Sequence, residues 1–134
     1  MQLIKNPDTS RGLEYRVARV IYAETRASSL AVVEALASMI ANLSAASHRD
    51  IAELITDDSI FETLKPNNPW HENLNVSADA PAFQMCLRVA HRMLRGNLPD
   101  CCNGATRFHR ADLLPSWCTS LGYIHDGGVL LFYR

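Results

Sequence analysis

The sequence lacks an excess of charge of either sign. Its 13 Lys and Arg residues are balanced by 14 Asp and Glu residues, which gives a net charge of −1. Proteins that bind nucleic acid or an anionic membrane surface usually carry a basic excess, because they must neutralise phosphate groups. We therefore expect no nucleic-acid partner, and charge alone indicates no other partner.

Long apolar stretches are also missing. No apolar run approaches the roughly 20 residues that a membrane-spanning helix requires. The first seven residues, MQLIKNP, do not form the apolar stretch of a signal peptide. We expect no membrane insertion, and a protein that is made in the cytoplasm without a recognisable signal peptide.

Cysteine is scarce, and its placement suits neither disulfides nor a metal. The adjacent pair Cys101-Cys102 does not fit a secreted disulfide framework, in which each half is usually joined to a distant segment. The spacings Cys-x-x-Cys and His-x-x-x-His that are typical of zinc sites are absent around the residues that would supply ligands: Cys101, Cys102, Cys118 and His109. We expect free thiols in a reducing compartment, no metal and no cofactor.

The chain does contain enough apolar residues for one core. It has 134 residues, 48% of them hydrophobic, without an internal repeat or a low-complexity tract. We expect a single domain over residues 1–134, in which residues 1–10 form an N-terminal extension.

Helical periodicity dominates the first half of the sequence. Over residues 11–25, apolar side chains recur at spacings of three, four and seven, which predicts a helix with Glu24 at the end of its apolar face. A second helix is expected over residues 29–43, with small residues that permit tight packing against the first. The Ser-x-x-acid pattern of residues 47–50 predicts the cap of a short third helix.

The second half of the sequence is more mixed. Residues 57–80 lose periodicity and are rich in turn formers, so we expect a long surface segment that shapes a binding site. Pro81 and Gly96 suit the two ends of another helix. Alternation over residues 105–109 predicts a strand, and Asp126-Gly127 predicts a two-residue hairpin turn. The fold class is α+β, mostly α, with a small antiparallel sheet near the C-terminus.

Glu24 is the clearest candidate for a catalytic residue. A carboxylate on the buried face of a helix is costly to ionise, because loss of water disfavours its charged form and raises its pKa. Such a group keeps its proton near neutral pH, as a general acid must. Periodicity alone also allows Glu24 to reach solvent or to pair with Arg26 or Arg107.

An ordered set of short motifs runs along the chain from Ala18 onward. It consists of Ile21-Tyr22-Ala23-Glu24-Thr25-Arg26, Asn42, Gly104-Ala105-Thr106-Arg107-Phe108-His109, Trp117 and Phe132-Tyr133-Arg134. In order and spacing this set resembles the cell wall hydrolase family typified by the spore cortex-lytic enzyme SleB. The resemblance implies a lysozyme-like helical core with a small sheet, and it makes Glu24 the catalytic acid. The chain differs from the family pattern at Ala27-Ser28 and at residues 60–63, which bears on substrate preference.

The resemblance also implies a reaction, the cleavage of peptidoglycan glycan strands between N-acetylmuramic acid and N-acetylglucosamine by lytic transglycosylation. One carboxyl first protonates the leaving oxygen and then takes a proton from the C6 hydroxyl of the muramic acid. No second carboxylate is needed, whereas ordinary glycosidases place two acids across the bond. If water is the nucleophile instead, the sequence offers four unranked acids as partners of Glu24: Asp57, Asp58, Glu62 and Glu72.

Two other functions stay open beside glycan cleavage. One is an N-acetylmuramoyl-L-alanine amidase, and the other is a non-catalytic wall-binding or particle-assembly module. For each, the expected partner is peptidoglycan, and the expected place of action is the cell wall. The delivery route is not specified by the sequence; a phage-like particle or a secretion apparatus would serve.

Five further residues are candidates for substrate binding. Asn42 suits either a helix C-cap or a substrate contact, and His109 suits either a structural role or a hydrogen bond to a sugar or stem peptide. Trp70 lies in a polar segment where an exposed ring can stack on a sugar, whereas Tyr133, like Trp117, favours the core. Arg107 is expected on the same strand face as His109.

Overall fold

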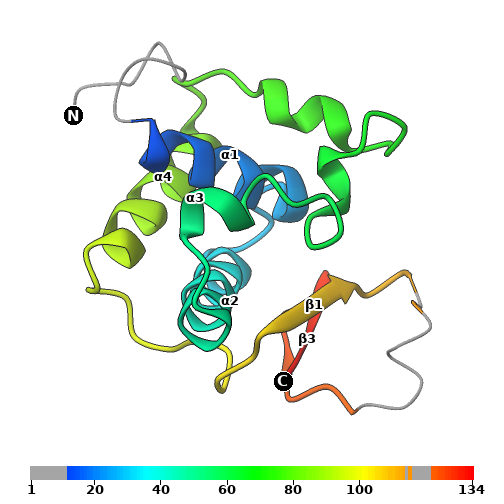
Figure 1. Ribbon diagram of the computed structural model, residues 1–134. Coiled ribbons are helices and arrows are strands. Elements are labelled where there is room, and N and C mark those ends of the chain that lie inside the picture. The colour runs from blue at the N-terminus through cyan, green and yellow to red at the C-terminus, as the bar shows by residue number, and fades with distance from the viewer. Residues whose placement is uncertain (1–11, 114, 116–121) are drawn as a thin grey trace.

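The chain folds into a helical part followed by a small sheet. The structure, a computed structural model, describes residues 12–113, 115 and 122–134. The predicted N-terminal extension (residues 1–10) lies outside the described residues, as do Trp117 and Cys118. The elements, in chain order, are α1 (Leu13–Thr25), α2 (Leu30–Ser47), α3 (Ile51–Leu54), the 3-10 helices η1 (Glu62–Leu64) and η2 (His71–Asn75), α4 (Pro81–Leu94), β1 (Arg107–Arg110), β2 (His125–Asp126) and β3 (Leu130–Tyr133). Figure 1 shows β1 and β3 beside the helices, with the C-terminus at the sheet.

The connection between α1 and α2 is tight. Arg26 and Ala27 both have a φ of 53°, which turns the chain sharply after the last residue of α1. The Thr25 hydroxyl accepts a hydrogen bond from the Ala27 N–H at 3.0 Å, and the Ser29 hydroxyl accepts one from the Val32 N–H at 3.2 Å. Ser29 is therefore the N-cap of α2, as the expected start at residue 29 required.

The predicted end of α2 and the predicted cap of α3 are wrong. Small residues carry α2 on from Leu43 to Ser47, and the Ser47 hydroxyl donates to the Leu43 carbonyl oxygen at 2.6 Å. Ser47 is thus the last residue of one helix and not the cap of the next. Asp50 is the N-cap of α3, and no side chain caps that helix.

The helix α2 lies at the centre of the core. Val32, Val33 and all residues from Ala35 to Ile40 are buried, and the helix contacts α1, α3, α4 and β1. Of the described helices, α2 alone is long and apolar enough to cross a membrane by length and composition. Its burial in the core accounts for that composition without a membrane.

The expected helix between Pro81 and Gly96 is confirmed as α4, which packs extensively against α1. Pro81 is its first residue, where the missing N–H costs nothing. Phe83 is fully buried, and its ring centroid lies 4.9 Å from that of Tyr15 on α1. These contacts hold α1 against α4.

The sheet is antiparallel with the order β1-β3-β2. The predicted hairpin between β2 and β3 is present, but its turn is shifted by two residues. The Gly127 N–H donates to the Leu130 carbonyl at 2.9 Å, which makes Gly128 and Val129 the turn residues. Gly127 itself directly follows β2, and a Cβ atom there would meet Phe132 Cε2 at 2.9 Å. The fold class is therefore confirmed as mostly helical with a small antiparallel sheet.

Candidate active site

Glu24 lies in the last turn of α1 and belongs to its buried face. Its residue exposure is 2%, and Val17 and Ile21 on the same face are fully buried. The prediction from periodicity is confirmed, because Glu24 neither reaches bulk solvent nor pairs with Arg26 or Arg107. The helix delivers a carboxyl group into the interior of the protein.

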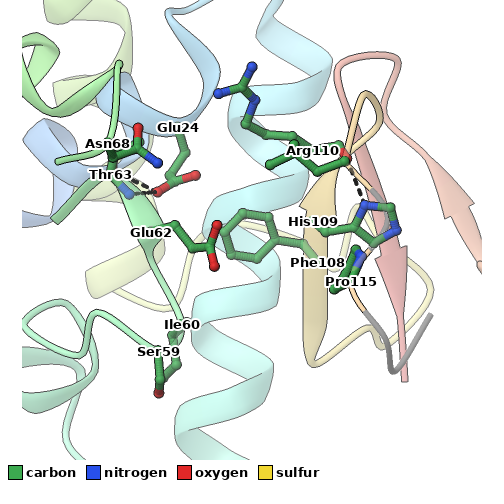
Figure 2. Close-up of a pocket in the computed structure, with 11 residues that line it drawn as sticks. Glu24, Ser59, Ile60, Glu62, Thr63, Asn68, Phe108, His109, Arg110 and Pro115 are labelled. Atoms are coloured by element: carbon green, nitrogen blue, oxygen red, sulfur yellow. Dashed lines mark hydrogen bonds between the residues drawn. The ribbon is translucent and has the colours of Figure 1, made fainter. Parts of the chain in front are cut away.

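Thr63 binds this carboxyl group from the opposite side. Its hydroxyl donates to Glu24 Oε2 at 2.6 Å, and its backbone N–H donates to the same oxygen at 3.2 Å. Both hydrogen bonds from the described residues go to Oε2. Figure 2 shows that the other oxygen of Glu24 points away from Thr63 into the pocket. The carboxyl group is thus held in one orientation with Oε1 presented to a ligand.

The environment raises the pKa of Glu24 above its ordinary value of 4.5. Burial is the largest cause, because it disfavours the charged form. The two hydrogen bonds from Thr63 and the positive charge of Arg110 lower the pKa and offset part of this rise, while the negative charge of Glu62 adds to it. Glu24 therefore retains its proton at higher pH than an exposed glutamate.

The pocket in front of Glu24 has a volume of about 320 Å³. We call it the first pocket. One wall comes from α1 and from the segment 59–68, and the facing wall comes from β1 and the residues that follow it. Segment 59–68 supplies Ser59, Ile60, Glu62, Thr63 and Asn68, which agrees with the expectation that residues 57–80 shape a site. Residues 57–80 are not devoid of regular structure, however, because they contain η1 and η2.

The fold is similar to that of a solved structure. That structure is the catalytic domain of the germination-specific lytic transglycosylase SleB from Bacillus anthracis, with a TM-score of 0.73, 14% sequence identity and coverage of 96% of this chain and 99% of that chain. The chain has the fold of the SleB catalytic domain. The fold that the motifs led us to expect is thereby confirmed. No protein-family model and no curated protein matches the sequence.

Of the four acids considered as partners of Glu24, Glu62 alone lines the first pocket of this SleB-like fold among the described residues. Its side chain is 58% exposed and forms an ion pair with Lys65 at 3.7 Å. Asp57 lies beyond the pocket and is bound by Arg49 and Ser59. Glu62 is therefore the second carboxylate that a substrate in the pocket would meet.

Arg110 brings a positive charge to the first pocket, and Trp70 supports it. The Arg110 Cζ lies 3.6 Å from the centroid of the Trp70 ring, and the Arg26 Cζ lies 5.1 Å from the same centroid. Cations in these positions are attracted to the ring face. Trp70 was expected to be an exposed ring for sugar stacking. It is instead half-buried and packs against arginine.

His109 lines the first pocket, but both of its ring nitrogens are hydrogen-bonded within the protein. Nδ1 contacts the Arg110 carbonyl oxygen at 2.7 Å, and Nε2 contacts the Tyr133 hydroxyl at 2.8 Å. The two rings are stacked with centroids 5.2 Å apart. Tyr133 is 4% exposed and lies in the core, as favoured from the sequence. The contact between His109 and Tyr133 therefore stabilises the side of the first pocket that β1 forms.

Asn42 lies outside the first pocket and holds a loop. Its Nδ2 donates to the Ala105 carbonyl oxygen at 3.1 Å and to Asp100 Oδ1 at 3.4 Å. Because α2 continues to Ser47, Asn42 is not a C-cap. The structure therefore gives it a third role, in which it attaches the chain before β1 to α2.

Three of the four cysteines are described, and all three are free. Burial raises the pKa of the Cys86 thiol and of the Cys102 thiol to about 12, so neither ionises readily. No three His, Cys, Asp or Glu residues gather as a metal-binding group in the described ranges.

Among the residues of the first pocket that the sequence analysis did not single out, Thr63 and Arg110 act on Glu24. Thr63 and Arg110 have no local pattern that connects them to Glu24, since they lie in other segments of the chain. A lone threonine in a segment without periodicity carries no signal. Arg110 follows the predicted strand by one residue, so only the extension of β1 to Arg110 would have placed it.

Proposed function

We propose that this chain cleaves peptidoglycan glycan strands between N-acetylmuramic acid and N-acetylglucosamine as a lytic transglycosylase, with Glu24 as acid and then base. The buried Glu24 carboxyl, fixed by Thr63 and open to the first pocket through Oε1, carries the proposal. The fold shared with a domain described as a lytic transglycosylase supports it.

In the first step, Glu24 donates its proton from Oε1 to the glycosidic oxygen as the bond to that oxygen breaks. Burial raises the pKa of Glu24 and so favours its protonated form before reaction. Once the proton has left, the two hydrogen bonds from Thr63 and the charge of Arg110 stabilise the carboxylate. The same residues therefore lower the barrier for proton release without removing the proton at rest.

In the second step, the Glu24 carboxylate takes a proton from the C6 hydroxyl of the muramic acid. The C6 oxygen attacks the anomeric carbon, which closes an anhydro ring and returns Glu24 to its protonated form. One carboxyl suffices, because the nucleophile comes from the substrate. Glu62, at the edge of the first pocket, then supplies only negative charge near the developing cation.

Hydrolysis is the second candidate reaction, and the position of Glu62 favours it over the remaining alternatives. A carboxylate in the same pocket as Glu24 is where a general base for water would lie. An amidase would cut elsewhere and release stem peptides, and a wall-binding module would release nothing. We further propose that residues 1–134 act as one catalytic domain at the cell wall, with residues 1–10 as an extension, delivered by a phage-like particle or a secretion apparatus.

Digestion of purified peptidoglycan, followed by mass spectrometry of the soluble fragments, tests the proposal. Anhydro-muropeptides are expected, and Glu24→Gln abolishes their release because it keeps the shape but removes the proton donor. Glu72→Gln, at an exposed glutamate of η2, is the matched control and retains activity. Fragments with reducing ends would indicate a hydrolase with Glu62 as base. Free stem peptides would indicate an amidase. Full activity of Glu24→Gln would refute the mechanism.

A further inference from the structure

Asn68 lines the first pocket, and one end of its amide group is open to a ligand. Its Oδ1 accepts a hydrogen bond from the backbone N–H of Trp70 at 2.8 Å. A backbone N–H can only donate, so this bond identifies the oxygen of the amide and leaves Nδ2 on the other side. Figure 2 shows Nδ2 pointing toward Glu24, which lines the same pocket. Among the described residues, none accepts a hydrogen bond from Nδ2.

The loop that carries Asn68 is held together by hydrogen bonds across it. The Nδ1 atom of His71 lies 2.8 Å from the carbonyl oxygen of Thr63, which joins the two ends of the loop. Within the loop, the Asn68 N–H donates to the Lys65 carbonyl oxygen at 2.9 Å, and the His71 N–H donates to the Asn68 carbonyl oxygen at 3.0 Å. Thr63 in turn binds the carboxyl group of Glu24. The same loop therefore positions both the amide group of Asn68 and the acid.

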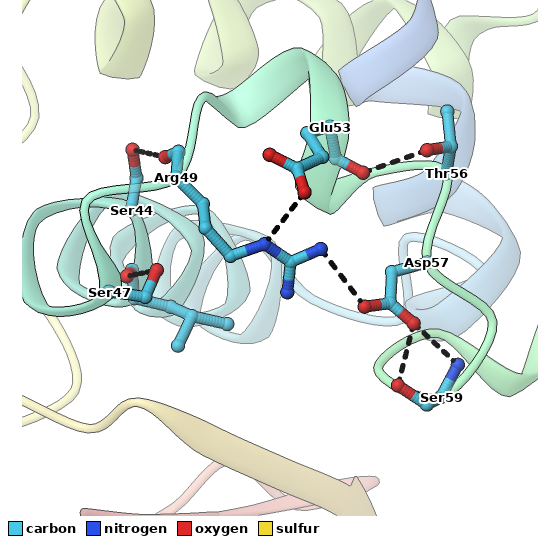
Figure 3. Close-up of polar contacts among 8 residues, drawn as sticks. Ser44, Ser47, Arg49, Glu53, Thr56, Asp57 and Ser59 are labelled. Atoms are coloured by element: carbon cyan, nitrogen blue, oxygen red, sulfur yellow. Dashed lines mark hydrogen bonds and ion pairs between the residues drawn. The ribbon is translucent and has the colours of Figure 1, made fainter.

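The start of the segment 59–68 is fixed as well. Asp57 Oδ1 accepts hydrogen bonds from the Ser59 hydroxyl at 2.6 Å and from the Ser59 N–H at 2.9 Å, and its Oδ2 accepts one from Arg49 Nη2 at 3.2 Å. Figure 3 shows these bonds, which attach the chain before the first pocket to a residue between α2 and α3. A donor on a segment that is already ordered loses little conformational entropy when a ligand binds. Nδ2 of Asn68 is therefore a preorganised donor.

The open end of Asn68 is suited to an oxygen acceptor, because an amide NH2 group donates hydrogen bonds and accepts none. In the proposed reaction, the sugar whose bond is broken has its anomeric carbon beside Glu24. The neighbours of that carbon in the ring are the ring oxygen and C2, and in muramic acid C2 carries the acetamido group. An acetamido carbonyl oxygen is a stronger acceptor than a ring oxygen. It is therefore the acceptor that a donor beside the acid would meet.

We propose that Asn68 determines specificity for N-acetylated glycan, by donating a hydrogen bond from Nδ2 to the acetamido carbonyl oxygen of the muramic acid whose glycosidic bond is cleaved. This inference rests on the proposed function, which places that sugar at Glu24. A muramic acid that has lost its acetyl group presents an ammonium group instead. That group also only donates, so Nδ2 has no acceptor and two donors face each other. The first pocket therefore disfavours deacetylated muramic acid.

The test compares three glycan strands in the Glu24→Gln background, which is expected not to consume its ligand. All three strands are fluorescently labelled and freed of their peptide stems by an amidase. One is fully N-acetylated, one is enzymatically deacetylated on its muramic acid residues, and one on its glucosamine residues. Binding is followed by anisotropy in mildly acidic buffer, where the free amino groups carry a proton. Deacetylation of the muramic acid is expected to weaken binding about tenfold, and deacetylation of the glucosamine less than about twofold.

Asn68→Asp is the variant that tests the donor itself. It keeps an oxygen for the Trp70 N–H, so the turn is retained, and it replaces the donor by a carboxylate oxygen. We expect it to bind fully acetylated strands about tenfold more weakly than the parent does. It is expected to bind strands deacetylated on muramic acid more tightly than the parent does, because the carboxylate pairs with the ammonium group. Asn67→Asp, which adds the same charge at an exposed neighbour that does not line the first pocket, is the matched control and is expected to keep the preference of the parent.

The outcomes separate this inference from the proposed function. Equal binding of all three strands by the parent, or no binding of any, would overturn the role of Asn68, and this comparison needs no variant at position 68. A preference that follows the acetyl group of glucosamine, an unchanged preference in Asn68→Asp, or the same reversal in Asn67→Asp would also overturn it. Urea denaturation checks that both variants are folded. The proposed function fails separately, when the unmodified protein releases no fragments from peptidoglycan, and the binding comparison does not depend on turnover.

Discussion

Replacing Glu24 by glutamine is expected to change the pH dependence of stability as well as abolish activity. The folded state holds the Glu24 proton above the ordinary pKa of 4.5, whereas the unfolded chain releases it near that value. Between the two pKa values the folded state binds more protons than the unfolded state. Stability contributed by this group therefore falls as pH rises above 4.5 and levels off at the folded pKa. Glutamine cannot ionise, so the variant escapes this loss.

The size of this difference in unfolding free energy follows from the binding of one proton by Glu24. Relative to Glu24→Gln, the unmodified protein loses about 1.4 kcal/mol of unfolding free energy for each unit by which the folded pKa is raised. The cause is structural, because a residue that is 2% exposed has lost its water, and Thr63 and Arg110 replace only part of that solvation. Glutamine keeps an oxygen for the Thr63 donors, so both proteins are expected to have similar stability below pH 4.

Urea denaturation of both proteins at pH 4 to 8 measures the difference directly. The expected curve is near zero at pH 4, then increasingly in favour of Glu24→Gln, and then flat. Glu72→Gln serves as the control for removing a carboxylate from the surface. A difference that does not vary with pH, or that favours the unmodified protein at neutral pH, would show that Glu24 is ionised in the folded state and would refute the argument from burial.

Two other substitutions test the surroundings of the acid. Thr63→Val removes the 2.6 Å hydrogen bond that lowers the pKa of Glu24, so the alkaline limb of the pH–rate profile is expected to move to higher pH, and an unmoved limb would contradict this. Asn42→Ala removes the bond to Ala105 and is expected to cost about 1 kcal/mol of stability in thermal or urea unfolding, while kcat/KM per folded molecule stays within about twofold. A large loss of kcat/KM at unchanged stability would return Asn42 to the substrate site.

The helices and the burial of Glu24 were predictable because they depend on local periodicity. The apolar repeat of α1 places Glu24 on the same face as Val17 and Ile21, and all three residues are buried. A helical pattern needs no knowledge of the partner element, only of the fact that one face must be covered. The apolar repeat therefore placed Glu24 on the buried face of α1 before any tertiary contact was known.

The residues that act on Glu24 were not predictable in this way. Thr63 is separated from Glu24 by 39 positions, and its two hydrogen bonds exist only because η1 lies against α1. Arg110 depends on the length of β1, and Asn42 on a loop 63 positions away. Such contacts follow from the packing of distant segments, which a pattern within one segment does not specify.

The predicted positions of one helix cap and one turn were wrong for a different reason. Ser47 and Asp126-Gly127 fit their motifs. In the structure, however, the N-cap of α3 is Asp50 and the hairpin turn is formed by Gly128 and Val129. The Ser47 hydroxyl bonds back within α2, and Gly127 is needed where Phe132 leaves no room for a Cβ atom. Local rules thus found the right region and missed the residue.

The bond between Thr63 and Glu24 has a consequence for the timing of activity during folding. The dry surroundings of Glu24 are completed by a segment synthesised well after α1, so a chain in which residues 59–68 have not yet closed leaves Glu24 in water. In water a glutamate is ionised at neutral pH and has no proton to give. Under the proposed mechanism, a nascent or partly opened chain therefore has less protonated Glu24 available as a general acid than the closed chain has.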